Sequence, residues 1–246
     1  MVTHGGASPL CHNAHMSDAS EIAHPRRIRS FVLRAGRITG AQARALETEW
    51  PRYGIDHATT PIDLDARFGR AAPCTLEIGF GNGDNLLAYA SAHPERNCLG
   101  IEVHRAGVGH LLWSAAAAGL NNLRVMCHDA VEVLEHCIAP GALDEILILF
   151  PDPWHKKRHH KRRLVQAEFI ALLATRLRSS GRLQLATDWE PYAAQMLEII
   201  GANPDFTNIA GPAGFVPRPH WRALTRFERR GQRLGHGVYD MSYLRR

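Results

Sequence analysis

The sequence predicts an α/β fold in which helices cover both faces of a mostly parallel sheet. Short apolar runs alternate with helical segments along most of the chain, as expected for strands joined by helical crossovers. A glycine-rich turn at residues 79–83 follows the first of the core strands. With 246 residues, 45% of them hydrophobic and 22% charged, the chain is long enough to bury one large core.

Residues 1–25 are predicted to be a flexible tail, because Gly, Ser, Asn and His are mixed there with few large apolar side chains. The histidines of this tail match no ligand spacing, so no metal site is predicted. Residues 26–246 are predicted to form a single domain. Its first segment, RRIRSFVLRAGRIT at residues 26–39, is a basic arm that folds back on the domain or onto a partner.

Two short elements precede the core. A helix is predicted over residues 41–49 and ends at Pro51, and a second element spans residues 62–68. The core begins with a strand at 74–78, the glycine turn and a helix at 86–92. This is a strand, turn and helix unit.

The same alternation continues to residue 201. Strands are predicted at 98–103, 123–127, 146–150 and 183–186, and helices at 106–118, 129–137, 164–177 and 192–201. Right-handed crossovers bring the carboxyl ends of parallel strands to one edge, where ligands of such sheets bind. We expect five residues to meet at that edge: Gly79, Glu102, Asp129, Asp152 and Asp188.

The carboxyl-terminal part departs from this alternation. Residues 211–220 are rich in Gly and Pro and are predicted to be a loop that faces the substrate. Two short runs around residues 231–237 are consistent with a closing pair of antiparallel strands. Neither an internal repeat nor an interdomain linker is evident.

The glycine turn, EIGFGNG at residues 77–83, has glycine at alternate positions directly after a strand. Its backbone can therefore turn sharply and approach a ligand closely. A dinucleotide fingerprint requires glycine where Asp84 stands, which disfavours NAD and FAD. The carboxylate of Glu77 suits the cationic methionine portion of S-adenosylmethionine. The alternative is an ordinary turn with a capping acid.

Two further acids follow the next strands. Glu102 is placed where an acid can accept both hydroxyls of a ribose. Asp129 is positioned for the adenine side of the same ligand, and capping the next helix is an equally good interpretation.

In the stretch ILILFPDPWHKKRHHKRR, residues 146–163, a predicted buried strand is followed, after PDPW, by a run of basic residues. Two prolines fix φ on either side of Asp152 and predict a rigid acid at the strand end. Every residue from His155 to Arg163, hereafter the basic segment, is Lys, Arg or His. Such a run is often only a solvated surface, but its place beside the predicted ligand edge favours contact with RNA or DNA.

Two weaker signals lie further along the chain. Asp188 and Trp189 follow the fifth core strand. Thr225, Arg226, Phe227 and Glu228 offer a hydroxyl, a cation, a ring and an acid, which suit the edges of guanine or a pocket wall.

Charge and cysteine usage narrow the class of protein. A net charge of +5 favours polyanions only weakly. The five cysteines are scattered without a CxxC pair, which predicts a reduced, cytoplasmic protein. No apolar run approaches the roughly 20 residues of a membrane span.

The chain resembles the bacterial tRNA (guanine-N7-)-methyltransferases from about residue 26 to 244. The resemblance rests on LEIGFGNG, GIEVHRAG, NLRVMCHDA and LATDW, and most specifically on LFPDPWHKKRHHKRR with TRFE. It implies a Rossmann-like, seven-stranded sheet with an antiparallel closing strand, and a reaction that methylates guanine N7 at position 46 of the tRNA variable loop.

The resemblance also implies roles for individual residues. S-adenosylmethionine is the implied cofactor, bound by Glu77, Gly79, Gly81, Gly83, Glu102, Asp129 and Asp152, with Asp152 in the active site. The implied substrate contacts are Lys156, Asp188, Thr225, Arg226, Phe227 and Glu228. The implied RNA contacts are Arg158, His159, His160, Lys161, Arg162 and Arg163.

The chemistry of the implied reaction assigns Asp152 a particular task. Guanine N7 has a lone pair and no proton, so no general base is needed before attack. Asp152 is therefore expected to orient the reactants and to stabilise the transferred positive charge. Trp154 and Phe227 are candidates to stack on the base or to form packed wall. Methyl transfer to another RNA, a protein or a small molecule, and RNA binding without catalysis, are the alternatives.

Overall fold

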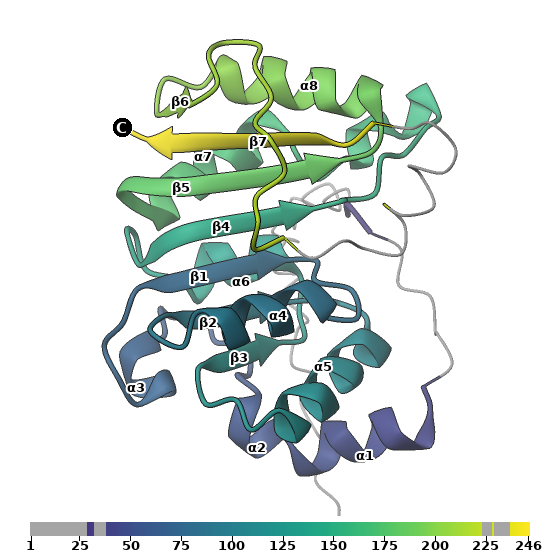
Figure 1. Cartoon of the computed structure of the whole chain (residues 1–246), viewed down its shortest axis with the longest axis vertical. Coiled ribbons are helices and arrows are strands. Elements are labelled where there is room, and N and C mark those ends of the chain that lie inside the picture. Colours follow the sequence, from purple (N-terminus) through teal and green to yellow (C-terminus); the bar gives the residue numbers. More distant parts are fainter. Residues whose placement is uncertain (1–28, 32–37, 223–227, 229–236) are drawn as a thin grey trace, which may run out of the picture.

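A seven-stranded sheet runs through the whole molecule (Figure 1). The computed structural model describes residues 29–31, 38–222, 228 and 237–246. The sheet order is β3-β2-β1-β4-β5-β7-β6. The strands are β1 Cys74–Ile78, β2 Asn97–Ile101, β3 Leu123–Met126, β4 Leu143–Leu149, β5 Leu177–Thr187, β6 Phe206–Asn208 and β7 Tyr239–Arg245.

Strands β1 to β5 pair in parallel, whereas β7 is antiparallel to both β5 and β6. The predicted fold class is thereby confirmed. The closing pair was predicted around residues 231–237, whereas the antiparallel strand of the structure is β7, which pairs with β5 on one side and with β6 on the other. A strand of three residues carries no alternation that a sequence pattern could reveal. Residues 231–236 lie outside the described part of the chain.

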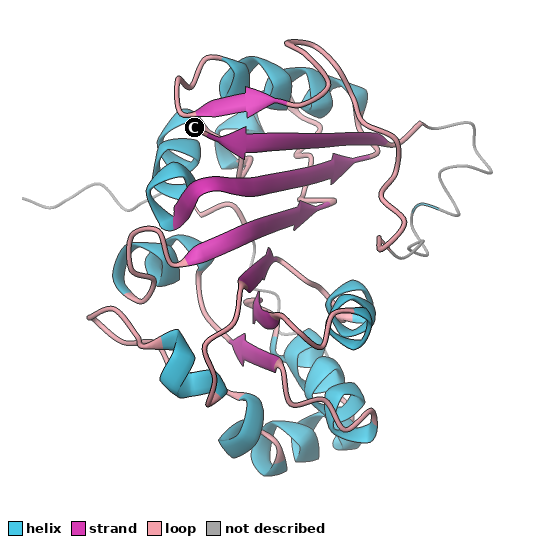
Figure 2. Ribbon diagram, turned by 60° about the vertical axis from the view of Figure 1, so that its left-hand side comes forward, coloured by secondary structure: helices cyan, strands magenta, loops and turns pink. Residues whose placement is uncertain are grey.

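Helices cover both faces of the sheet, as predicted (Figures 1 and 2). They are α1 Gly40–Thr48, α2 Trp50–Tyr53, α3 Leu64–Phe68, α4 Asp84–Ala92, α5 Arg105–Ala117, α6 Ala130–His136, α7 Ala167–Arg176 and α8 Glu190–Gly201, with a 3-10 helix, η1, at Lys157–Arg162. The short α2 was not predicted. Pro51 lies in its first turn, where the missing N–H costs no hydrogen bond. None of the described helices is long and apolar enough to cross a membrane.

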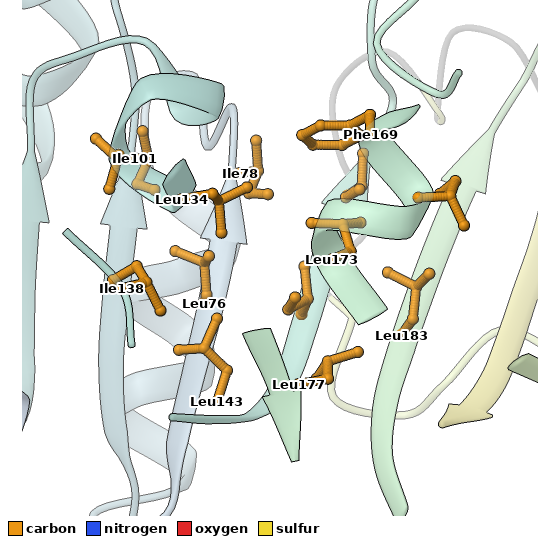
Figure 3. Packing of buried hydrophobic residues seen from close by; sticks show 14 of the residues in the cluster. Leu76, Ile78, Ile101, Leu134, Ile138, Leu143, Phe169, Leu173, Leu177 and Leu183 are labelled. Carbon is orange, nitrogen blue, oxygen red and sulfur yellow. The ribbon is translucent and has the colours of Figure 1, made fainter. Parts of the chain in front are cut away.

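The core has two layers because the strands alternate the faces to which they send side chains. On one face, Leu76 and Ile78 of β1 pack with Leu134 of α6 and Leu173 of α7 (Figure 3). On the other face, Leu111 belongs to a cluster shared by α1, α4 and α5. With both faces covered, the carboxyl edge of the parallel strands is left as the place for a site.

Candidate active site

The glycine turn between β1 and α4 adopts a backbone that requires glycine. Gly79, Gly81 and Gly83 have φ values of 71°, 61° and 83°. A Cβ at Gly107 of α5 would lie 2.0 Å from the carbonyl oxygen of Gly81, so the helix packs directly on the turn. The turn is therefore held in one shape at the carboxyl end of β1.

Glu77 lies beneath this turn and has little contact with solvent. Its side chain is buried, and its Oε2 accepts a hydrogen bond of 2.9 Å from Asn85. Burial raises the pKa of Glu77 to about 7, against the opposing effect of the Asn85 hydrogen bond. Its predicted contact with a cofactor stays a prediction, because the residue is outside the lining of the cleft described below.

Glu102, directly after β2, is oriented by backbone hydrogen bonds. Its carboxylate accepts hydrogen bonds from the backbone N–H groups of Gly81 at 2.8 Å, Val103 at 2.7 Å and His104 at 3.0 Å. These bonds join the ends of β1 and β2. A carboxylate held in this way is positioned before any ligand arrives, which lowers the entropic cost of binding.

Asp129, directly after β3, is the N-cap of α6. One oxygen of its carboxylate accepts the Val131 N–H at 2.9 Å. The capping interpretation is therefore confirmed. The side chain also lines the cleft, so capping and ligand binding are compatible.

A cleft of about 210 Å³ lies at this edge of the sheet. Of the predicted cofactor residues, it brings together Gly79, Glu102, Asp129 and Asp152. Sequence reasoning missed the remaining wall, formed by Ser30, Phe31, Ile78, Ile101, Val103, His104, His128, Ala130, Phe150, Pro151 and Leu164. A neighbouring hollow of about 530 Å³ shares Phe31, Val103, His128 and Asp129 with it.

Part of the basic arm forms one wall of this cleft. The backbone oxygen of Ser30 accepts a hydrogen bond of 3.0 Å from Trp154 Nε1, and that of Phe31 accepts one of 3.3 Å from Arg162. The described residues of the arm thus fold back on the domain. The sequence signal for this was Phe31, an apolar ring among the cationic residues of the basic arm.

Trp154 is half-buried, and two side chains of the basic segment pack on its ring. The guanidinium of Arg162 lies 4.2 Å from the centroid of its ring, and the ring of His159 meets it edge-on at 5.9 Å. Of the two predictions for Trp154, the structure supports packed wall. Phe227, the other stacking candidate, lies outside the described residues.

The turn after β4 carries Asp152. Phe150 and Trp154 have φ values of 53° and 45°, a left-handed backbone that costs non-glycine residues roughly 1–3 kcal/mol. Asp152 between them is exposed, lines the cleft and has no hydrogen-bond partner within the described chain. A strained turn thus presents a carboxylate whose oxygens are available to a ligand.

Asp188 and Lys156 lie near this turn but outside the lining of the cleft. Asp188 is half-buried after β5, the strand that pairs with β4 up to Leu149 and Ala186. The rings of His155 and Trp189 meet edge-on at 4.2 Å and join the two turns. Lys156 is exposed and directly precedes η1.

The basic segment divides into exposed and structural side chains. Lys156, Lys157, Arg158 and Lys161 are exposed, and His159, His160 and Arg162 are partly exposed. The pKa of His159 is lowered by desolvation and then by the positive charges of Arg158 and Arg162. A phosphate beside this group of cations would relieve their repulsion.

Arg163 differs from the other cations of the segment, because only 3% of it is exposed. It donates to the carbonyl oxygen of Pro153 at 2.8 Å and to Gln195, and its guanidinium lies 4.7 Å from the ring centroid of Tyr192. Contrary to the prediction for RNA, this side chain supports the turn that carries Asp152. The sequence alone could not identify its partners, which lie up to 32 residues away.

The predicted substrate residue Glu228 is also buried. Its carboxylate accepts two hydrogen bonds from Arg222, of 2.7 and 2.9 Å, and is 1% exposed. Its companions Thr225, Arg226 and Phe227 lie outside the described residues. In the described part of the chain, no group of three or more His, Cys, Asp or Glu side chains could hold a metal ion.

The sheet order is that of a Rossmann-like fold, and the chain matches a methyltransferase family over most of its length. Residues 71–241 match the family model described as putative methyltransferase. Two solved structures share the fold: a 16S rRNA methyltransferase, KamB, with TM-score 0.53 and 16% identity, covering 74% of this chain and 93% of that one, and the 16S rRNA (adenine(1408)-N(1))-methyltransferase from Catenulisporales acidiphilia, with TM-score 0.52 and 19% identity, covering 75% and 92%.

The chain belongs to the tRNA (guanine-N(7)-)-methyltransferase family. It is 55% identical over 217 residues to a relative of that name from Leifsonia xyli subsp. xyli, covering 88% of this chain and 95% of the relative. It is 52% identical over 240 residues to one from an Acidovorax species, covering 98% and 95%.

Proposed function

We propose that this protein transfers a methyl group from S-adenosylmethionine to N7 of guanine in tRNA and so makes 7-methylguanosine. The observation that carries the proposal is the cleft that unites Gly79, Glu102, Asp129 and Asp152 in a chain of this family. In line with the resemblance, the proposed target is position 46 of the variable loop. Its tRNA substrate makes the cytoplasm the proposed compartment.

The residues of the cleft fit the chemistry of S-adenosylmethionine. Glu102, whose carboxylate is held by backbone N–H groups, is the proposed acceptor of the ribose hydroxyls, and Asp129, which lines the same cleft, is the proposed contact on the adenine side. The glycine turn at 79–83 leaves room for the methionine portion, with Glu77 beneath it. When bound, the cofactor supplies an electrophilic methyl group on a sulfonium.

In the proposed reaction the lone pair of N7 forms a bond to the methyl carbon as the carbon–sulfur bond breaks. Positive charge passes from sulfur to the purine, and no proton has to be removed first. The Asp152 carboxylate, held in the cleft by the strained turn, favours this charge and helps to align the two reactants.

Guanine recognition is proposed for residues beside the cleft. Asp188 offers a half-buried carboxylate for the N1 and N2 groups of guanine, and Lys156 a cation beside the same turn. The roles of Thr225, Arg226 and Phe227 stay predictions. For Glu228 the buried pairing with Arg222 supports an indirect role.

The proposed phosphate surface consists of the exposed part of the basic segment. Its exposed Lys and Arg residues are Lys156, Lys157, Arg158 and Lys161, and its partly exposed residues are His159, His160 and Arg162. Exposed lysines and arginines bind phosphate by releasing counterions, which makes binding depend on salt. Arg163 is removed from the proposed set because its donors are used inside the protein.

The proposal is tested by incubating unmodified tRNA with S-adenosylmethionine labelled in its methyl group and analysing the nucleosides. We expect the label in 7-methylguanosine, and none in a matched tRNA with adenosine at position 46. Label in another nucleoside, or labelling of protein but not of tRNA, would overturn the proposal. Label retained with adenosine at position 46 would overturn only the position.

A further inference from the structure

Arg222 is the largest of the fully buried side chains in the described chain, with 1% of it exposed. Its guanidinium donates four hydrogen bonds. Two reach the carboxylate of Glu228, at 2.7 and 2.9 Å, and two reach the carboxylate of Asp240, both at 2.9 Å. Every nitrogen of the planar group is therefore used, in the paired geometry that arginine forms with carboxylates.

These bonds join segments that meet at the end of the sheet carrying the cleft. Asp240 lies near the start of β7, where it is in register with Ala186 of β5. The carbonyl oxygen of Ala186 in turn accepts the N–H of Phe150 at 2.7 Å. The guanidinium carbon of Arg222 lies 5.3 Å from the centroid of the Phe150 ring, within the range of a cation–π contact.

Phe150 is the residue through which this group reaches the cleft. It lines the cleft and has a φ of 53°, so its surroundings must stabilise a backbone that it would otherwise avoid. Asp152 follows two residues later, after the fixed φ of Pro151. A shift of Phe150 would therefore move the turn that carries the Asp152 carboxylate.

Arg222 is well suited to such a role because it stays charged and stationary. Although burial acts to lower it, the pKa of Arg222 is raised by its hydrogen bonds with Glu228 and Asp240. Since the side chain is closed off from solvent, it acts through these neighbours rather than by touching substrate.

We propose that Arg222 is a positioning residue for methyl transfer: bound to Glu228 and Asp240, its guanidinium holds the ring of Phe150 and thereby sets the Asp152 carboxylate in the cleft. The inference rests on the proposed function. It also gives Glu228 a task, because the carboxylate of Glu228 fixes the orientation of Arg222.

The test must separate positioning from general stability, since removing one partner of a buried ion pair is strongly destabilising. We therefore choose Arg222→Lys, which keeps the charge but not the fork, and the uncharged triple variant Arg222→Met, Glu228→Gln, Asp240→Asn, which leaves no carboxylate unpaired. Glu145→Gln is the matched control. Glu145 is a buried carboxylate of β4 bonded to Tyr89 and Thr75, toward the opposite end of the strand.

The measurement is the single-turnover rate of methyl transfer with saturating cofactor and tRNA, per folded molecule. We expect both Arg222 variants to lose roughly 10- to 100-fold, as for a misplaced catalytic group, while the dissociation constant for S-adenosylhomocysteine changes less than about threefold. Glu145→Gln should lose stability and keep its rate. A wild-type rate in either Arg222 variant, or an equal loss in Glu145→Gln, would overturn the inference.

Failure of the proposed function is distinguishable from this outcome. It would appear as a wild-type protein that makes no 7-methylguanosine. Failure of the inference alone would appear as an active wild type and an inactive Asp152→Ala beside fully active Arg222 variants.

Discussion

Asp152 and Glu228 are both acids predicted for the site, Asp152 as the catalytic residue and Glu228 as a substrate contact, yet the structure places them in opposite surroundings. Asp152 is exposed in the cleft and has no hydrogen-bond partner in the described chain, whereas Glu228 is 1% exposed and bound at both oxygens by Arg222. The same contrast separates Lys161, which is exposed, from Arg163, which is buried. Charged residues that the sequence groups together thus divide into those exposed to a ligand and those that are buried and bonded within the protein.

Glu228→Gln gives the largest effect that we expect, on stability. The change leaves Arg222 with one charged partner in place of two, and disrupting a buried ion pair typically costs about 3–5 kcal/mol. Chemical denaturation followed by circular dichroism measures the free energy of unfolding. A loss below about 1 kcal/mol would mean that this carboxylate is available to substrate, and the contrast with Asp152 would disappear.

Asp152→Ala should have the converse effect, on catalysis. Loss of a preorganised charge at the reacting group costs about 10²- to 10³-fold in kcat, or roughly 2.7–4 kcal/mol. Stability should change by less than about 0.5 kcal/mol, because the side chain is exposed. The assay is methyl transfer at saturating tRNA, with Asp152→Asn as the control that preserves shape. Near-normal turnover in the alanine variant would remove Asp152 from the mechanism.

Glu77 is a third acid to set beside Asp152 and Glu228, because it is buried and hydrogen-bonded to the amide of Asn85. Glu77→Gln tests how its ionisation affects stability. The folded-state pKa is raised from 4.5 to about 7, so the folded protein binds the proton more tightly than the unfolded chain. Stability from this group is present below pH 4.5 and is lost as pH rises to 7, by up to about 3 kcal/mol. The free energy of unfolding of the wild type, relative to that of Glu77→Gln, should therefore fall as pH rises from 4.5 to 7. A difference independent of pH would show that Glu77 is ionised throughout.

The smallest effect is expected at the surface of the basic segment. Replacing Arg158 and Lys161 by Ala should flatten the dependence of log affinity for tRNA on log salt by roughly 1.4–1.8, because two phosphates are no longer neutralised. Cofactor affinity should not change. Arg163→Ala is the internal comparison, because it should lower stability and affect the salt slope far less. An unchanged slope in the double variant would make the segment a solvated surface.

The local sequence pattern correctly predicted the strands and the glycine turn that position the site. Each core strand was found, and glycine at residues 79, 81 and 83 has the positive φ that the turn requires. The acids Glu102, Asp129 and Asp152 follow successive parallel strands, and connection handedness alone brings such positions to one edge. These features depend on residues close in sequence or on topology.

Features that depend on distant partners were not predictable in this way. Arg163 is typical of a phosphate contact in sequence, and only its bonds to Pro153 and Gln195 reveal a structural role. Ser30 and Phe31 line the cleft from a segment more than 120 residues before their partners Trp154 and Arg162. The partners of β6 and of Glu228 are likewise set by tertiary packing, which no local pattern encodes.

The most direct test of the division between cleft and phosphate surface is a double-mutant cycle on kcat/KM for tRNA. Its corners are the wild type, Asp152→Ala, the Arg158→Ala and Lys161→Ala pair, and the three changes together. Because Asp152 is assigned to the reacting groups and the two cations to phosphates, their losses of transition-state free energy should add within about 0.5 kcal/mol. A coupling above about 1 kcal/mol would contradict the division and show that the acid and the cations act as one site.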